Sequence, residues 1–255
     1  MTASASTRSA SPSSLRAPKS KDGPGDLTVS AARSIAMTVL PSRSSLIHTG
    51  SALPSGRETT SSWSAPPGLD TGEGNLLCRA MRAVGRTAAV RLEKHIPVGG
   101  GLGGGSADAA AVLRWAGCGD ITVGAGLGAD VPFCLVGGRA RVTGIGDEIE
   151  ALPFEERTFT LLPYPRQVST VGVYEAWDAL GGPTVDGSND LEPPAVRVEP
   201  ELAVWRDRLG DATGRTPMLA GSGGTWFVEG SFPDVRGAIV ARTERQQEGS
   251  RQVVE

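Results

Sequence analysis

The sequence predicts an α+β protein, and three of its features lead to this prediction. Segments whose apolar side chains recur at helical spacing interleave with short strand-like runs along the chain. Their order lacks the regular strand–helix–strand repeat that builds a parallel sheet. With 255 residues, 39% of them hydrophobic, the chain can bury the core of one large domain or of two modest ones.

Helices are expected where apolar residues recur every three or four positions. The clearest case is 75–83, where Leu76, Leu77, Ala80 and Met81 would share one face. Further helices are expected over 106–116, 173–180 and 200–209.

Strands are expected where β-branched and aromatic residues gather between turn residues. One is predicted over 88–96, where Pro97 would end it because proline cannot continue an interior ladder. Others are expected over 139–142, before a glycine turn at 144–146, over 159–162 as a central strand, and over 225–228.

Residues 1–70 differ in composition from the rest of the chain. They are rich in Ser, Thr, Ala, Pro and Arg, and no apolar periodicity persists in them. Such a segment cannot bury enough apolar surface to offset the entropy lost on ordering. We therefore predict a poorly ordered leader over 1–70.

Charge and cysteine usage limit the partners. The formal net charge of −3 argues against a nucleic-acid surface, which would need a surplus of Lys and Arg. No run of apolar residues is long enough to span a membrane, and the first residues lack the apolar core of a secretion signal. Three separated cysteines and two histidines favour reduced thiols in a cytoplasmic protein over a metal site.

The most informative segment is 97–108, in which six of the seven residues from Gly99 to Gly105 are glycine. Without side chains, backbone N–H groups can converge on an anion. A helix with Ser106 at or near its N-cap would add free N–H groups and a positive dipole end. The pattern therefore predicts a loop that binds the phosphates of a nucleotide.

Three other interpretations of this loop are possible, and the residues argue against each of them. A flexible linker rarely carries Leu102 inside it and an Ala-rich helix directly behind it. A P-loop requires Gly-Lys-Ser/Thr, and no lysine follows here. The spacing Gly-x-Gly-x-x-Gly is present, but a run of glycines satisfies it by chance, and Pro97 disagrees with the tight turn of a dinucleotide-binding fold.

The segment 97–108 resembles the central motif of the GHMP kinases, in the Gly-Gly-Gly-Ser-Ala-Asp-Ala-Ala-Ala form of the members that act on a cytidylated methylerythritol. Further matches follow in the family's order at Asn75-Leu76-Leu77 with Arg79-Ala80, at 127–133 (Leu-Gly-Ala-Asp-Val-Pro-Phe), at Gly137-Gly138, at Ser169-Thr170 and at Gly221-Ser222-Gly223. The resemblance implies transfer of the γ-phosphoryl of ATP, with Mg²⁺, to the 2-hydroxyl of 4-diphosphocytidyl-2-C-methyl-D-erythritol, in the non-mevalonate route to isoprenoid precursors. The partner would be this small molecule, with no nucleic acid and no membrane.

The resemblance also implies an architecture. It places a ribosomal protein S5 domain 2-like, ATP-binding domain over 71–155 and a ferredoxin-like domain over 156–242. A polar tail would follow over 243–255. We expect a monomer or a weak homodimer.

The resemblance assigns roles on the nucleotide side. Asp130 would be the catalytic carboxylate, although such a residue could equally cap a helix. Ser106 could contact Mg²⁺ as well as cap its helix, Asp108 would be mainly structural, and Asn75 could lie near the base or cap the helix that follows it. The ATP-binding set would be Pro97, Val98, Gly99, Gly100, Gly101, Leu102, Gly103, Gly104, Gly105, Ser106 and Asn75.

On the substrate side, Tyr174 offers an aromatic face on which the cytosine could stack, unless it only packs in a core. Thr170 precedes it by one helical turn. The loop formed by Gly221, Ser222 and Gly223 would close on the phosphate and the substrate. Ala220 and Gly224 are mild departures from the family pattern at this loop.

The chain departs from the family in two further places. The first family motif, an Ala-Lys-(Ile/Val)-Asn-Leu strand followed by Asp-Gly-Tyr-His, is absent. Our hypothesis is that residues 1–70 are altered coding sequence, for instance from a shifted reading frame. The connection between Arg114 and Leu127 is short, which suggests a trimmed helix. Two alternatives therefore stay open: a nucleotide-binding remnant with impaired catalysis, and a GHMP kinase for another small molecule.

Overall fold

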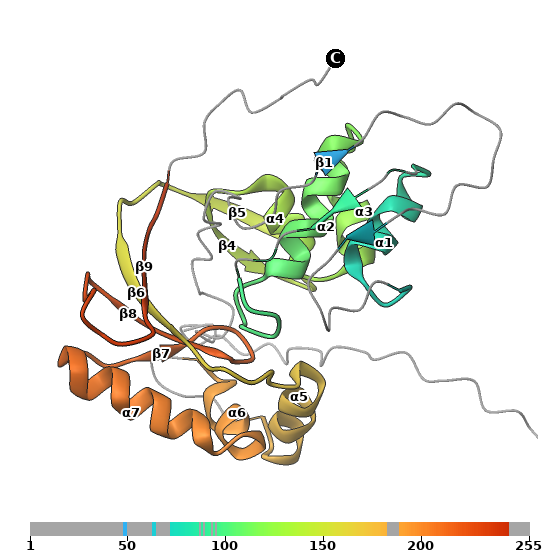
Figure 1. Cartoon of the computed structure of the whole chain (residues 1–255). Helices are drawn as coiled ribbons and strands as arrows, with labels where there is room; N and C mark the ends of the chain where they lie inside the picture. Colours follow the sequence, from blue (N-terminus) through green and yellow to red (C-terminus); the bar gives the residue numbers. More distant parts are fainter. Residues whose placement is uncertain are drawn as a thin grey trace, which may run out of the picture.

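The computed structural model describes residues 72–86, 88, 90–92, 94, 96–182 and 189–244, together with the backbone of 48–49 and 63–64. Helices and mainly antiparallel sheets are combined in it, so the predicted α+β class is confirmed (Figure 1). The helices are α1 (Leu76–Ala83), α2 (Gly104–Trp115), α3 (Ile121–Leu127), α4 (Val131–Val136), α5 (Thr170–Ala179), α6 (Glu192–Val198) and α7 (Glu201–Thr213). The strands are β1 (His48–Thr49), β2 (Trp63–Ser64), β3 (Val90–Arg91), β4 (Arg139–Thr143), β5 (Glu148–Leu152), β6 (Thr158–Pro163), β7 (Met218–Leu219), β8 (Thr225–Glu229) and β9 (Ile239–Arg242).

The first four helices pack around one apolar core. The predicted helix over 75–83 is confirmed as α1, whose residues Leu77, Ala80 and Met81 are buried. The alanines of α2 are small enough to let α1 and α4 approach it closely, which buries Leu113 and Val131 completely. This core sets the positions of both ends of α2 and of the turn that precedes α4.

The strand predicted over 88–96 is largely wrong among the described residues, because only β3 is a strand there. β3 pairs antiparallel with β1 and parallel with β2. Both partners are two residues long, so the ladder ends after two residues and the chain turns away toward α2. Apart from these two short pairings, the predicted leader over 1–70 lies outside the described residues, as does most of the predicted tail.

β4 and β5 form an antiparallel hairpin in which Arg139 lies opposite Leu152. This confirms the strand predicted over 139–142 and the glycine turn that follows it. At that turn Gly146 has φ +100, and a Cβ on it would lie 1.9 Å from the carbonyl oxygen of Ala129. The hairpin therefore packs directly against the turn that carries Asp130.

The second half of the chain is built on a four-stranded antiparallel sheet in the order β7-β8-β6-β9. The predicted central strand is confirmed, since β6 pairs with both β8 and β9. Along β6 and β8 the side chains alternate: Leu162 and Trp226, which lie opposite each other, are fully buried. Phe159 and Phe227 stand on the other face and contact each other edge to face.

The buried face of this sheet is covered by α5, α6 and α7 (Figure 1). Val173 of α5, Leu202 and Leu209 of α7 and the β8 residues Trp226 and Val228 form a second core. The helices predicted over 173–180 and 200–209 are confirmed as α5 and α7. The sequence did not indicate α3, α6, β5, β7 or β9.

Among the described residues, every helix is too short or too polar to cross a bilayer.

Candidate active site

The first glycine loop, residues 97–105, leads from β3 to the start of α2. Every second residue from Gly99 to Gly103 has a positive φ: the values are +75° for Gly99, +69° for Gly101 and +67° for Gly103. The amide of Gly100 donates to the carbonyl of Pro97 at 3.1 Å, which closes a tight turn. Residues with side chains rarely adopt these conformations, so the bend depends on glycine.

The prediction that Ser106 caps α2 is wrong. Gly103 is the N-cap, and α2 begins at Gly104. Because Gly103 adopts the left-handed conformation, the chain turns into the helix before it reaches the serine. Ser106 is buried in the first turn, beside backbone N–H groups that have no partner within the helix.

The second glycine loop, residues 220–224, packs directly against the first. A Cβ on Gly101 would lie 2.1 Å from the carbonyl oxygen of Ala220, and one on Gly224 would lie 2.2 Å from that of Gly99. Real Cβ contacts are never this short, so the two backbones touch only because both positions are glycine. The segments predicted to bind the phosphates and to close on the substrate therefore meet.

Two residues that sequence reasoning missed hold these loops. The buried side-chain amide of Asn189 donates to the carbonyls of Leu219 and Gly221 at 2.9 and 2.6 Å. Gln167 follows β6 and lies against Gly99, at 3.3 Å from where a Cβ would stand. Neither residue belongs to a motif, so no sequence signal pointed to them.

The substrate-side residues come from two elements. The hydroxyls of Thr170, at the start of α5, and Ser222, in the second glycine loop, are 2.9 Å apart. Ser169 caps α5 by accepting from the amide of Gly172. Tyr174 lies one turn further along α5 with 52% of its surface exposed, so the alternative in which it only packs in the core is wrong.

Asp130 immediately precedes α4 and lies in the N-cap position, but its side chain makes no capping hydrogen bond. Its carboxylate has no hydrogen bond or ion pair to any of the described residues. The residue is exposed to solvent on one side, yet nearby protein atoms desolvate the carboxylate and raise its pKa. A carboxylate without a structural partner is available to accept a proton.

One side chain links the turn that precedes Asp130 to the start of α2. The methyl carbons of Leu76 lie 3.7 Å from the Cβ position of Gly105 and 4.0 Å from that of Gly128. Gly105 is in the first turn of α2, and Gly128 is two residues before Asp130. The buried thiol of Cys134 also responds to this region, because burial and then the charge of Asp130 raise its pKa to about 12.

Lys94 and Asp108 form a buried ion pair that sequence reasoning missed. Their side chains are 11% and 4% exposed. The ammonium of Lys94 also lies 3.6 Å from the Cβ position of Gly104, at the start of α2. Lys94 lies between two motifs and belongs to neither, so the sequence alone did not indicate this ion pair.

Asn75 caps α1, as one of its two predicted roles required. Its side-chain oxygen accepts from the amide of Leu77 at 2.9 Å. The cap sets the direction in which α1 enters the core and so places Leu76 between the two turns described above.

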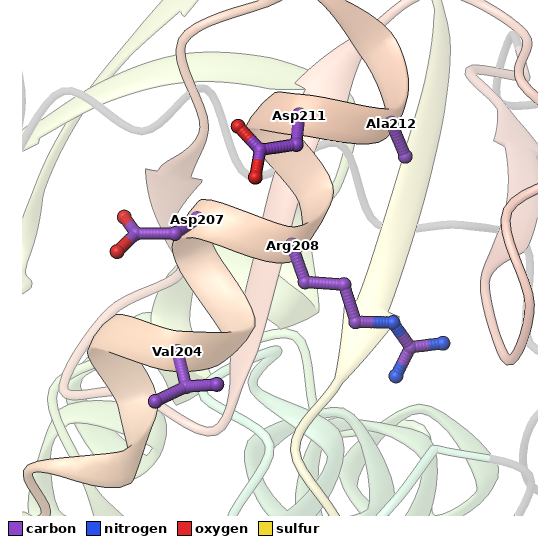
Figure 2. A pocket seen from close by; sticks show the side chains of 5 residues that line it. All are labelled: Val204, Asp207, Arg208, Asp211 and Ala212. Carbon is purple, nitrogen blue, oxygen red and sulfur yellow. The ribbon is translucent and has the colours of Figure 1, made fainter.

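A surface hollow lies elsewhere, along α7 (Figure 2). α7 contributes none of the predicted site residues, and the hollow presents two carboxylates and one guanidinium on an open helix face. It is lined by Val204, Asp207, Arg208, Asp211 and Ala212.

The comparisons with known proteins agree with this geometry. The family described as GHMP kinases N terminal domain matches residues 75–138, which contain α1, the first glycine loop and Asp130. A crystal structure of 4-(cytidine 5'-diphospho)-2C-methyl-D-erythritol kinase superposes with a TM-score of 0.57 and 26% identity, covering 78% of this chain and 84% of that one. The fold and the loop together define the class, that of the GHMP kinases.

Curated relatives narrow the class to one family. A 4-diphosphocytidyl-2-C-methyl-D-erythritol kinase of Paracoccus denitrificans (strain Pd 1222) is 38% identical over 195 residues, which are 69% of this chain and 70% of that protein. The kinase of the same name from Nitrosomonas europaea (strain ATCC 19718) is 37% identical over 164 residues, covering 56% of this chain and 58% of the relative. The chain belongs to the family of 4-diphosphocytidyl-2-C-methyl-D-erythritol kinases.

Proposed function

We propose that the chain transfers the γ-phosphoryl of ATP to the 2-hydroxyl of 4-diphosphocytidyl-2-C-methyl-D-erythritol, in isoprenoid precursor synthesis. One observation carries the proposal: two glycine-rich loops meet backbone to backbone at the start of α2, and Leu76 links that start to the turn before Asp130, a carboxylate with no partner among the described residues. Phosphoryl transfer needs mainly positioning and charge stabilisation, which such an arrangement supplies.

The first glycine loop would bind the triphosphate. The free N–H groups at the start of α2 and the alternating glycine backbone offer donors to phosphate oxygens, and the helix dipole favours negative charge there. Asn75, which caps α1, would lie at the base side of the nucleotide while keeping its structural role.

Asp130 would accept the proton of the attacking hydroxyl. The hydroxyl oxygen forms the new bond to phosphorus while the bond to the β-phosphate oxygen breaks, and ADP leaves. The raised pKa of Asp130, caused by desolvation, makes it a better base than an ordinary carboxylate.

The cytidylated substrate would lie along α5 and the second glycine loop. The paired hydroxyls of Thr170 and Ser222 can bind its polar groups, and exposed Tyr174 can stack on the cytosine ring. Gly221 and Gly223 leave the backbone on either side of Ser222 uncovered by side chains, so that it can approach a phosphate.

Mg²⁺ fits this site as an ion held mainly by the nucleotide. Among the described residues, no three acidic, histidine or cysteine side chains gather to form a metal cage, and Asp108 is already paired with Lys94. The hydroxyl of Ser106 would be the protein's contact. When bound, the ion neutralises charge on the transferring phosphate.

We further propose that the chain has two domains, 71–155 for ATP and 156–242 for the substrate, and that it acts in the cytoplasm as a monomer or weak homodimer. The two separate clusters of buried residues support the division. The three cysteines are reduced thiols, of which Cys134 is buried, and this suits a reducing compartment.

The test is a turnover assay of the full chain with ATP, Mg²⁺ and the cytidylated substrate. We expect ADP release that depends on this substrate, and a fall of about 10²–10⁴-fold in kcat for Asp130→Asn with nucleotide affinity kept. A substrate panel including homoserine and mevalonate tests the alternative of another GHMP kinase. An unchanged rate in Asp130→Asn would remove Asp130 from the mechanism.

A second candidate function is nucleotide binding without turnover. It is favoured by the absence of the first family motif and by the pairing of Lys94 with Asp108, which leaves Asp130 without a lysine partner among the described residues. Calorimetric titration with an ATP analogue separates the two, because binding without ADP release supports this candidate.

A further inference from the structure

The Lys94–Asp108 ion pair lies at the base of the first glycine loop. Lys94 is in the segment that leaves β3, and Asp108 is in α2, just beyond its first turn. The chain between them, 95–107, contains the whole loop. The pair therefore joins the point where the chain enters the loop to the point where it leaves.

The surroundings of the pair show that it is built into the fold. Both side chains are almost fully buried, and Lys94 also contacts the start of α2 at Gly104. Ile96 packs on the same glycine, at 3.5 Å from its Cβ position. A buried charge is tolerated only when it is paired, so this ion pair is part of the folded structure and not a chance surface contact.

A loop this rich in glycine has much conformational freedom to lose when it binds a ligand. At its middle, the loop is held by contact between Gly101 and Ala220 and between Gly99 and Gly224. At its base, only Lys94 and Asp108 tie entry to exit by a charged side-chain contact among the described residues. Anchoring the ends reduces the entropy that nucleotide binding must overcome.

We propose that Lys94 and Asp108 are positioning residues that clasp the first glycine loop in its nucleotide-binding conformation. The inference rests on the proposed function, since it concerns the same phosphate site. Neither residue needs to touch the reacting atoms. Their effect is on the affinity of the loop for phosphates, with the substrate side unchanged.

The experiment measures ADP affinity by calorimetry, and the KM for ATP and for the cytidylated substrate, in Lys94→Met, Asp108→Asn and Lys94→Arg. We expect the Kd for ADP and the KM for ATP to rise about tenfold or more in the first two variants. A tenfold rise in Kd corresponds to a loss of about 1.4 kcal/mol of binding free energy. The KM for the cytidylated substrate should stay unchanged. Lys94→Arg, which keeps the charge, should restore most of the affinity.

Glu229→Gln is the matched control. It breaks an ion pair with Arg157 at the last residue of β8, in the four-stranded sheet. It should leave the Kd for ADP unchanged. Equal ADP affinity in the unmodified chain, Lys94→Met and Asp108→Asn would overturn the clasp and leave the kinase proposal intact. Failure of the unmodified chain to bind ADP would instead contradict the proposed function.

Hydrogen exchange covers the case in which Lys94→Met and Asp108→Asn do not fold. In the unmodified chain without nucleotide, the peptide spanning 94–108 should exchange more slowly than an unstructured peptide of the same sequence, and Lys94→Arg, which keeps the charge, should retain most of this protection. Exchange at the rate of an unstructured peptide in the unmodified chain would contradict the clasp.

Discussion

The position of Asp130 affects both turnover and the stability of the folded chain. Desolvation raises its pKa in the folded state above the value of about 3.9 expected in the unfolded chain. The ionised carboxylate is therefore destabilising at neutral pH. This destabilisation of the folded state is absent below the unfolded-state pKa. It grows as the pH rises from there through the folded-state pKa.

We expect Asp130→Asn to be more stable than the unmodified chain at pH 7 while losing turnover. Urea unfolding at several pH values from 7 down toward the unfolded-state pKa of about 3.9 checks this, because the difference in unfolding free energy should shrink toward acidic pH. The rate of the unmodified chain should fall over the same acidic range, as the base becomes protonated. Identical stability of the two proteins at every pH would show that the carboxylate is not desolvated.

Asp130 and Lys94 also show what single residues reveal before the fold is known. The prediction for Asp130 came from a motif of seven consecutive residues that resembles a known family, and its catalytic role stays a prediction. Lys94 stands beside the glycine loop but outside any motif, and its partner Asp108 is fourteen positions away. A pairing across a loop depends on how the loop returns, which residue spacing does not determine.

The two glycine loops act as one element through backbone contact. We expect Gly101→Ala to disrupt it for two reasons, since Gly101 has φ +69 and a Cβ would meet the carbonyl of Ala220 at 2.1 Å. Gly117→Ala is the control, because Gly117 has φ +74 but nothing within 4 Å of its Cβ position. The left-handed conformation alone should lower the unfolding free energy by about 1–2 kcal/mol in both variants.

Only the loop variant should lose more than this, and only it should raise the KM for ATP, by up to about 10²-fold if the phosphates are misplaced by an ångström. Steady-state kinetics and urea unfolding of both variants provide the test. If the two variants behave alike, the loop contact has no role beyond backbone strain.

Elements with strong periodicity were predictable, and those set by long-range pairing were not. α1 and β6 follow from the apolar patterns of their own residues. The 88–96 segment has an equally good strand pattern, yet β3 is two residues long because its partners supply only two residues each. Ser106 looked like a cap, but glycine at position 103 lets the helix begin earlier.

The described part of the chain contains two cores, and a glycine loop from each half meets the other backbone to backbone. The nucleotide loop belongs to the first half, whereas the loop that packs on it is anchored by Asn189 and β8 in the second half. A ligand that binds only the folded state stabilises whatever unfolds with its site. If the loop contact couples the halves, nucleotide bound to the first half should also stabilise the second.

Two probes can follow the halves separately. Trp177, Trp205 and Trp226 belong to the second core, whereas Trp115 lies on α2, so fluorescence in a Trp63→Phe, Trp115→Phe background reports unfolding of the second core. Cys134 is buried in the first core with its pKa raised to about 12, so its reaction with a thiol reagent reports opening of that half. We expect ADP at a hundred times its Kd to add about 2.7 kcal/mol to the unfolding free energy seen by both probes. A shift confined to Cys134 would mean that the halves unfold independently and that the glycine loops touch without transmitting stability.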